Sequence, residues 1–136
     1  MESLVIMKIA VLGGGMVGSL IATELAIDYH VTVFDNNKLE LGEINTIIRD
    51  VTKEEFKKEV VDYDIAVNCL PGFMGFEMLK KLIDLDISCI DISFMPENCL
   101  DLAKNASRKN VRIIPDAGIA PGLSNLIVGN IISKNN

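Results

Sequence analysis

Six short apolar segments recur along the chain, and longer segments with helical spacing separate them. Several of the six are nearly unbroken runs of valine, isoleucine and leucine, a pattern typical of parallel strands that are buried on both faces. The segments that we expect to form strands are 8–12, 31–34, 46–48, 65–68, 88–92 and 111–114.

The intervening segments carry apolar residues every three or four positions, which is the spacing of one helix face. The three clearest stripes are Val17, Leu20, Ile21 and Leu25, then Phe76, Leu79 and Ile83, and finally Leu123, Leu126, Ile127 and Ile131. We expect Thr52 to cap a helix over 53–60, and Pro96 to occupy the first position of a helix that runs to about Arg108.

Strand and helix therefore alternate about six times. Crossover connections of this kind are right-handed in nearly all proteins, and they build a parallel sheet between layers of helices. The sequence has no internal repeat, low-complexity tract or linker. We predict an α/β fold with a doubly wound parallel sheet of about six strands, helices on both faces, and a single domain over residues 1–136.

The segment GGGMVG (13–18) directly follows the first expected strand and directly precedes a helix. G-x-G-x-x-G in this position indicates a dinucleotide-binding Rossmann fold. Gly13 allows a tight turn, Gly15 lets a pyrophosphate approach the backbone, and Gly18 allows close helix packing. The helix N-terminus offers free N–H groups and about half a positive charge to the phosphates. The alternative is a glycine-rich turn that binds nothing.

Asp35 ends the second expected strand. A carboxylate there accepts hydrogen bonds from the adenosine ribose, and it repels the 2′-phosphate of NADP. Each pair of unit charges at ~4 Å costs about 4 kcal/mol at an effective dielectric constant of ~20. The next residues, Asn36, Asn37 and Lys38, include no arginine to bind a phosphate. We therefore expect NAD, with NADP possible through Lys38; Asp35 can also cap the helix that follows.

Ligands of a Rossmann fold bind outside the carboxyl ends of the strands. Asp50 and Val51 follow the third expected strand, where the adenine would lie. Leu70 and Pro71 follow the fourth, near the nicotinamide ribose, and Ser93 follows the fifth. The only histidine, His30, precedes the second strand and is predicted to lie at the opposite edge of the sheet.

Composition and charge exclude several other classes of protein. The chain of 136 residues is 49% hydrophobic and 24% charged, as expected for a folded globular domain. Its net charge of −6 disfavours nucleic acid as a partner. No apolar run reaches the ~18–20 residues of a membrane span, and the N-terminus does not resemble a signal peptide. Three cysteines in no zinc-like spacing predict no metal site and a cytoplasmic protein.

Several motifs together resemble those of one enzyme family. They are GGGMVG (13–18), RDVTKEEF (49–56), NCLPG (68–72), DISF (91–94) and IIPDAGIAPGLSN (113–125), and they span essentially the whole chain. In this order they resemble the saccharopine dehydrogenase family, especially its lysine 6-dehydrogenase branch. The resemblance implies an NAD(P)-dependent oxidoreductase that transfers hydride at the carbon–nitrogen bond of an amino acid, usually a lysine derivative. Phe94 departs from the aromatic hydroxyl or glycine pair common in the family.

The resemblance also implies roles for particular residues. Asp116 would face the nicotinamide and the substrate and manage the amine proton, although an aspartate there is also a common turn residue. The expected cofactor-binding residues are Gly13, Gly15, Met16, Val17, Gly18, Asp35, Asn36, Asp50, Val51, Leu70, Pro71 and Ser93.

In the family, a substrate and dimerisation domain follows at this point. We expect that domain to be absent from this chain, the chain alone to be inactive, and the full-length protein to be a homodimer. Two alternatives stay open: a non-enzymatic NAD-sensing domain of the potassium-channel type, and a related imine or polyamine reductase. The motif D-x-G-x-x-P-G-x-x-N after the sixth strand favours an enzyme.

Overall fold

All six strands pair into one parallel sheet, as the sequence pattern predicts. The structure is a computed structural model that describes residues 6–134. The strands follow the spatial order β3-β2-β1-β4-β5-β6, in which the chain reverses direction across the sheet between β3 and β4. They are β1 (Lys8–Leu12), β2 (His30–Asp35), β3 (Asn45–Ile48), β4 (Ile65–Asn68), β5 (Ser88–Asp91) and β6 (Ile113–Ile114).

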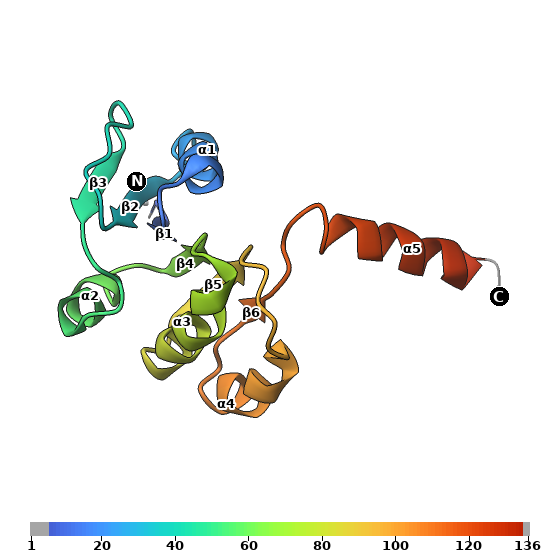
Figure 1. Cartoon of the computed structure of the whole chain (residues 1–136). Helices are drawn as coiled ribbons and strands as arrows, with labels where there is room; N and C mark the ends of the chain where they lie inside the picture. Colours follow the sequence, from blue (N-terminus) through green and yellow to red (C-terminus); the bar gives the residue numbers. More distant parts are fainter. Residues whose placement is uncertain (1–5, 135–136) are drawn as a thin grey trace, which may run out of the picture.

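Helices cover both faces of this sheet (Figure 1). One face packs against α1, and the opposite face packs against α2, α3 and α4. The helical segments are α1 (Met16–Leu25), α2 (Glu54–Val60), α3 (Gly72–Asp84), the short 3₁₀ helix η1 (Cys99–Leu102), α4 (Ala103–Arg108) and α5 (Leu123–Lys134). The predicted doubly wound α/β architecture is confirmed.

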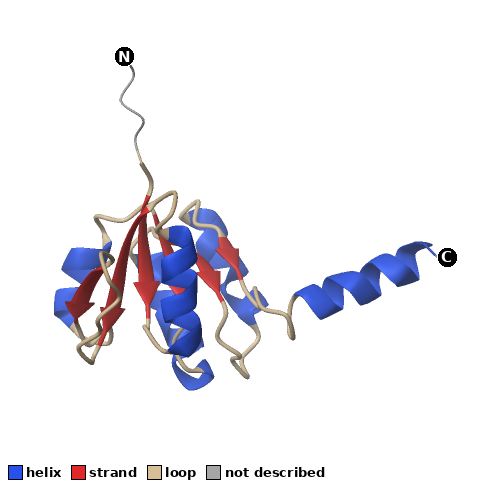
Figure 2. Ribbon diagram, turned by 90° about the horizontal axis from the view of Figure 1, so that it is seen from above, coloured by secondary structure: helices blue, strands red, loops and turns tan. Residues whose placement is uncertain are grey.

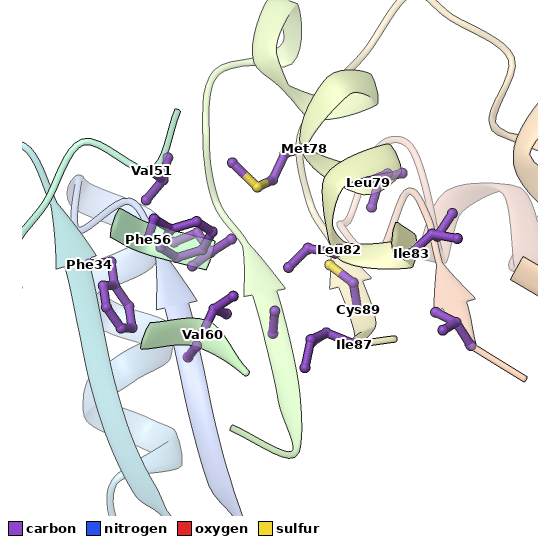
Figure 3. Close-up of a cluster of buried hydrophobic side chains, with 14 of the residues drawn as sticks. Phe34, Val51, Phe56, Val60, Met78, Leu79, Leu82, Ile83, Ile87 and Cys89 are labelled. Carbon is purple, nitrogen blue, oxygen red and sulfur yellow. The ribbon is translucent and has the colours of Figure 1, made fainter. Parts of the chain in front are cut away.

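The larger of two hydrophobic cores lies between the sheet and α2, α3 and α4 (Figure 3). Its centre includes Phe34 of β2 and Phe56 of α2, whose rings meet edge to face at 5.4 Å between centroids. This geometry adds a favourable electrostatic contact to the apolar area that the two rings bury. It fixes β2 and α2 together beneath the carboxyl ends of the strands.

A row of aliphatic side chains crosses the other face of the sheet in register. Val33, Val11, Val67, Ile90 and Ile114 are successive partners on β2, β1, β4, β5 and β6. The three valines are buried in the core beneath α1, whereas Ile90 is only half-buried and Ile114 is 57% exposed. The cover that α1 provides therefore ends before it reaches the β5–β6 side of this face.

Helix α5 extends away from the body of the domain (Figure 2). The predicted helix is confirmed, but none of its residues is buried. Its apolar stripe therefore covers neither of the two cores in this structure.

The stripe predicted for the first helix is partly wrong. Ile21 and Leu25 pack on the core, but Val17 and Leu20 are 54% and 61% exposed. The fully covered positions of α1 are small residues, including Ala22. A helix with small residues on its inner face approaches the sheet closely, which leaves neighbouring larger side chains outside.

Two predicted helix starts are also wrong. Lys53, not Thr52, holds the N-cap position of α2, and the Thr52 hydroxyl instead donates to Asp50. The chain does not become helical at Pro96, because the first turn begins only at Cys99 in η1. An Asn98 side-chain oxygen caps that turn by accepting the N–H of Leu100.

The last strand is shorter than the apolar run that predicts it. Val111 lies outside β6, because its N–H donates to the Ala106 carbonyl and thereby ends α4. Only Ile113 and Ile114 pair with β5.

Candidate functional site

A cavity of about 600 Å³ opens at the carboxyl ends of β1, β2, β3 and β4. This is the edge at which Rossmann folds bind ligands, and the volume lies in the range of small-molecule sites. The lining residues are Gly13, Gly15, Met16, Val17, Gly18, Phe34, Asp35, Asn36, Arg49, Asp50, Val51, Cys69, Leu70, Pro71, Phe73 and Met74. Every predicted cofactor-binding residue except Ser93 is among them.

The three motif glycines occupy the positions that their proposed tasks require. Gly13 has a φ of +91°, a left-handed conformation that other residues rarely adopt. A Cβ on Gly18 would lie 2.0 Å from the Gly13 carbonyl oxygen, so α1 could not approach the turn with any side chain there. A Cβ on Gly15 would meet no atom within 4 Å, because this position faces the cavity.

The N-terminus of α1 suits a pyrophosphate. Gly15 is its N-cap residue, no side chain caps the helix, and the first turn contains no acidic residue. Gly15, Met16, Val17 and Gly18 all line the cavity. Uncapped N–H groups at this end of a helix attract anions through hydrogen bonding and the helix dipole. The open space at Gly15 and this uncapped helix end together fit the phosphates of a dinucleotide.

Gly14 is a constrained position that sequence reasoning missed. Its N–H donates to Asp35 Oδ2 at 2.8 Å, which joins the glycine turn to the end of β2. An added Cβ would lie 2.1 Å from Leu39 Cδ1 and 2.9 Å from Val33 Cγ1. The motif pattern treats this position as variable, so no sequence signal marks it.

Asp35 is held by three hydrogen bonds. Oδ2 accepts from Gly14, and Oδ1 accepts from the backbone N–H and the side-chain amide of Asn37 at 2.8 and 3.2 Å. A carboxylate offers about four acceptor positions, so about one is left for a hydroxyl in the cavity. The residue is therefore fixed as an acceptor at the end of β2, as its predicted role requires.

The loop after β3 is fixed from two sides. Asp50 Oδ1 accepts from the Thr52 N–H and hydroxyl at 2.9 and 2.6 Å, and these bonds lower the pKa of Asp50. Lys81 of α3 donates to the carbonyls of Val51 and Thr52 at 2.9 Å each. Burial lowers the pKa of Lys81. Lys81 is far away in sequence and was not predicted to support this loop.

Arg49 is a further cavity residue that sequence reasoning missed. Its N–H donates to the Asp35 carbonyl oxygen at 2.7 Å, which places it beside the acid on the neighbouring strand. Its guanidinium donates to both carboxylate oxygens of Glu59 on α2, from Nε at 2.9 Å and from Nη2 at 2.5 Å. This bidentate pair raises the pKa of Arg49. The observation that no arginine directly follows Asp35 in sequence did not reveal this neighbour on the adjacent strand.

Ser93 does not line the cavity. It is buried, and its hydroxyl donates to Asp91 Oδ1 and Oδ2 at 2.9 and 3.1 Å. Asn68 at the end of β4 donates to the same carboxylate at 2.5 Å. Burial is the largest influence on the pKa of Asp91 and raises it, and the hydrogen bonds from Asn68 and Ser93 oppose that rise. The geometry gives Ser93 a place in a buried network; its cofactor role stays a prediction.

Asp116 lies in the exposed loop after β6, outside the cavity lining. Its φ is +54°, a left-handed conformation that aspartate tolerates better than most residues. A Cβ on Gly122 would lie 2.3 Å from the Asp116 carbonyl oxygen, so the loop folds tightly on itself. The Ala117 N–H donates to the Asp91 carbonyl at 2.9 Å and ties the loop to β5. This placement agrees with a turn role, and the catalytic role stays a prediction.

His30 and Cys69 are poorly suited to a role in this chemistry. His30 begins β2, at the opposite edge of the sheet from the cavity. Cys69 lines the cavity, but burial raises the pKa of its thiol to about 12, so it is held as an unreactive thiol.

Among residues 6–134, no group of three or more His, Cys, Asp and Glu side chains could hold a metal. No helix in that range is long and apolar enough to cross a membrane.

The parallel sheet order, the glycine turn and the uncapped helix end define a dinucleotide-binding domain of the Rossmann class. The chain belongs to the family described as the saccharopine dehydrogenase NADP binding domain, whose model matches residues 9–114. It is thus an NAD(P)-binding domain of saccharopine dehydrogenase-like oxidoreductases, and the predicted resemblance is confirmed at the level of the family.

Individual relatives agree with this assignment. The chain is 24% identical over 137 residues to the mitochondrial alpha-aminoadipic semialdehyde synthase of Rattus norvegicus, covering 93% of this chain and 15% of that protein. Apo saccharopine dehydrogenase (L-Glu forming) from Saccharomyces cerevisiae has a similar fold, with a TM-score of 0.82 and 20% identity over 94% of this chain. The chain covers 31% of that structure. It therefore spans only a minor part of either relative.

More distant structures share the fold alone. The structure of RSP in complex with beta-NADH has a TM-score of 0.61 and 17% identity, covering 96% of this chain and 64% of that one. The WlbA dehydrogenase of Thermus thermophilus, in complex with NAD and UDP-GlcNAcA, has a TM-score of 0.63 and 13% identity. That match covers 80% of this chain and 41% of the WlbA chain.

Proposed function

We propose that this chain is the cofactor domain of an oxidoreductase that transfers hydride at the carbon–nitrogen bond of an amino acid, with a lysine derivative as substrate. The family match over residues 9–114 carries this proposal. Its support in the structure is the cavity that the glycine turn, Asp35 and the loops after β3 and β4 form together. A bound nicotinamide cofactor supplies the hydride acceptor or donor, and the chain's own residues bind and orient it.

Each part of the cavity has a distinct proposed task. The main-chain N–H groups from Gly15 to Gly18 would bind the pyrophosphate, and Asp35 would accept a hydrogen bond from the adenosine ribose. Asp50 and Val51 would border the adenine, and Leu70 and Pro71 the second ribose. Because Asp35 is fixed and negatively charged, the proposed cofactor is NAD in preference to NADP.

Asp116 is the proposed group that manages the amine proton, with the substrate bound largely by parts of a longer enzyme that include the dimer interface. This agrees with the short span of this chain relative to the rat and yeast proteins. In that case the chain binds cofactor but oxidises no amino acid by itself.

Cofactor binding is tested by titrating NADH into this chain and following the calorimetric heat. The substrate is tested with the full natural gene product, NAD⁺ or NADP⁺, and either saccharopine, lysine or the diamine putrescine, by following formation of reduced cofactor. Oxidation of an amino acid supports the proposal. Oxidation of putrescine alone would favour the polyamine enzyme instead, and binding of NADH without oxidation of any amine would contradict the proposed reaction.

A non-enzymatic sensor is the second candidate, because the domain also shares its fold with RSP, a Rex-family repressor whose structure is known in complex with beta-NADH. A sensor would bind NADH and NAD⁺ with different affinities and would turn over no amine. The same two assays therefore separate the candidates.

A further inference from the structure

Arg49 occupies the part of the cavity where a 2′-phosphate would be recognised. Its N–H is bonded to the Asp35 carbonyl, and both residues line the cavity at the ends of adjacent strands. The proposed function directs the adenosine ribose to Asp35, so a phosphate on that ribose would be close to Arg49. A planar guanidinium is well suited to bind a phosphate through two parallel hydrogen bonds.

The guanidinium is already engaged, however. Nε and Nη2 donate to the two carboxylate oxygens of Glu59, and the two side chains remain 32% and 30% exposed. This fork-to-fork pairing satisfies the same donors that a phosphate would use. Glu59 itself lies outside this cavity and lines a separate pocket, together with Lys8 and His30, at the opposite edge of the sheet.

Other cations around this end of the cavity have less suitable positions or geometry. Lys81 donates to two carbonyls of the loop after β3. Lys38 and Lys53 are exposed and lie 3.2 and 3.9 Å from the carboxylates of Glu40 and Asp50. Exposed pairs of this kind hold a lysine weakly, and a lysine offers a point charge without the fork geometry.

We propose that Glu59 is a specificity-determining residue, which engages Arg49 and thereby keeps the guanidinium from binding the 2′-phosphate of NADP. This inference rests on the proposed NAD(P)-binding role of the cavity. Asp35 provides the direct repulsion, and Glu59 removes the cation that would otherwise offset it. Preference for NAD then depends on a residue of α2 that does not itself line the cavity.

The test measures dissociation constants of NADH and NADPH for the wild-type chain and for E59Q, E59A, R49M and the double variant E59Q/R49M. E59Q and E59A should tighten NADPH binding by about tenfold, as expected for one charge-assisted contact, with less than about threefold change for NADH. R49M in the wild-type background should leave NADPH binding nearly unchanged, and the double variant should lose the gain. Thermal unfolding confirms that each variant is folded.

E55Q is the matched control. Glu55 lies one turn earlier on α2 and acts on Arg49 only through its charge, without a hydrogen bond. If E55Q improves NADPH binding as much as E59Q does, a general charge effect replaces the specific pairing and the proposal is overturned.

Other results would also overturn it. They are an unchanged ratio of NADPH to NADH affinity in both Glu59 variants, a gain that persists in the double variant, or a wild-type chain that prefers NADPH. If the wild-type chain binds NADH normally, the first two results reject the role of Glu59 alone, whereas a preference for NADPH also rejects the proposed preference for NAD. If it binds neither cofactor, the proposed function fails and the inference fails with it.

Discussion

The N–H of Gly14 and the Oδ2 of Asp35 are joined by a hydrogen bond of 2.8 Å, although the residues are 21 positions apart in sequence. One belongs to the turn after β1, and the other ends β2. This bond connects the proposed pyrophosphate site with the proposed ribose site. Asp35 therefore orders the glycine turn, in addition to its proposed contact with the cofactor.

Replacement of Asp35 with alanine should weaken NADH binding by about 10- to 100-fold, since a hydrogen bond to a charged group contributes roughly 1.5–3 kcal/mol. NADPH binding should fall less, because the substitution also removes the repulsion of its 2′-phosphate. Calorimetric titration with both cofactors measures the two effects. D62N is the control, because Asp62 lies outside the cofactor cavity and lines a different pocket at the opposite edge of the sheet. Equal losses for both cofactors would contradict the discriminating role of Asp35.

Two glycines of the motif should respond to substitution in opposite ways. G15V should abolish cofactor binding and leave the free energy of unfolding nearly unchanged, since an added Cβ meets no protein atom within 4 Å. G18A should destabilise the fold by about 1–3 kcal/mol, the usual cost of overpacking, because its Cβ would lie 2.0 Å from the Gly13 carbonyl oxygen. Urea unfolding and NADH titration of both variants separate the effects. A G15V chain that still binds NADH as tightly would refute the proposed pyrophosphate site.

Local patterns predicted most of this fold. The apolar runs gave β1 and β4 at their observed bounds, because strands buried on both faces leave a strong signal. The glycine motif located the turn after β1, because the conformation of Gly13 and the close approach at Gly18 are local demands of that turn. Thr52 misled the prediction because its hydroxyl donates to Asp50 instead of capping α2. Pro96 misled it because the first helical turn begins three residues later, after the cap that Asn98 provides.

The missed parts of the site depend on contacts between distant segments. Arg49 becomes a neighbour of Asp35 only through the pairing of β2 with β3, and Lys81 reaches the loop after β3 only from α3. Neither contact produces a periodic or motif-like pattern. The sequence placed Ser93 correctly after the fifth strand, but not the direction of its hydroxyl, which the buried carboxylate of Asp91 attracts.

The buried carboxylate of Asp91 should make stability depend on pH. Its pKa is raised, chiefly by burial, so the folded protein retains this proton at pH values where the unfolded chain has lost it. Stability therefore falls as pH rises from the ordinary aspartate pKa of about 3.9 through the raised value, by at most about 1.4 kcal/mol per pH unit for one proton.

D91N should remove this contribution. Asp50 and Glu54 have lowered pKa values and contribute with the opposite sign, so the informative quantity is the difference between the urea unfolding curves of wild type and D91N across pH. The charge of Asp116 helps to raise the pKa of Asp91. D116N should therefore lower that pKa and narrow the pH range over which Asp91 reduces stability. A difference that does not change with pH would show that Asp91 titrates alike in the folded and unfolded chains.

Removal of α5 should hardly affect the stability of the domain. A chain of residues 1–122 lacks the helix but retains every residue of both cores, so its free energy of unfolding should stay within about 0.5 kcal/mol of the original. A chain of residues 1–110 is the matched control: it also loses Ile113, which packs against the larger core, and should be clearly less stable. If the first truncation instead costs several kcal/mol, α5 covers part of the sheet in solution. The half-buried Ile90 and exposed Ile114 would then be the surface it covers, and protection of α5 from amide hydrogen exchange in the full chain would identify that contact.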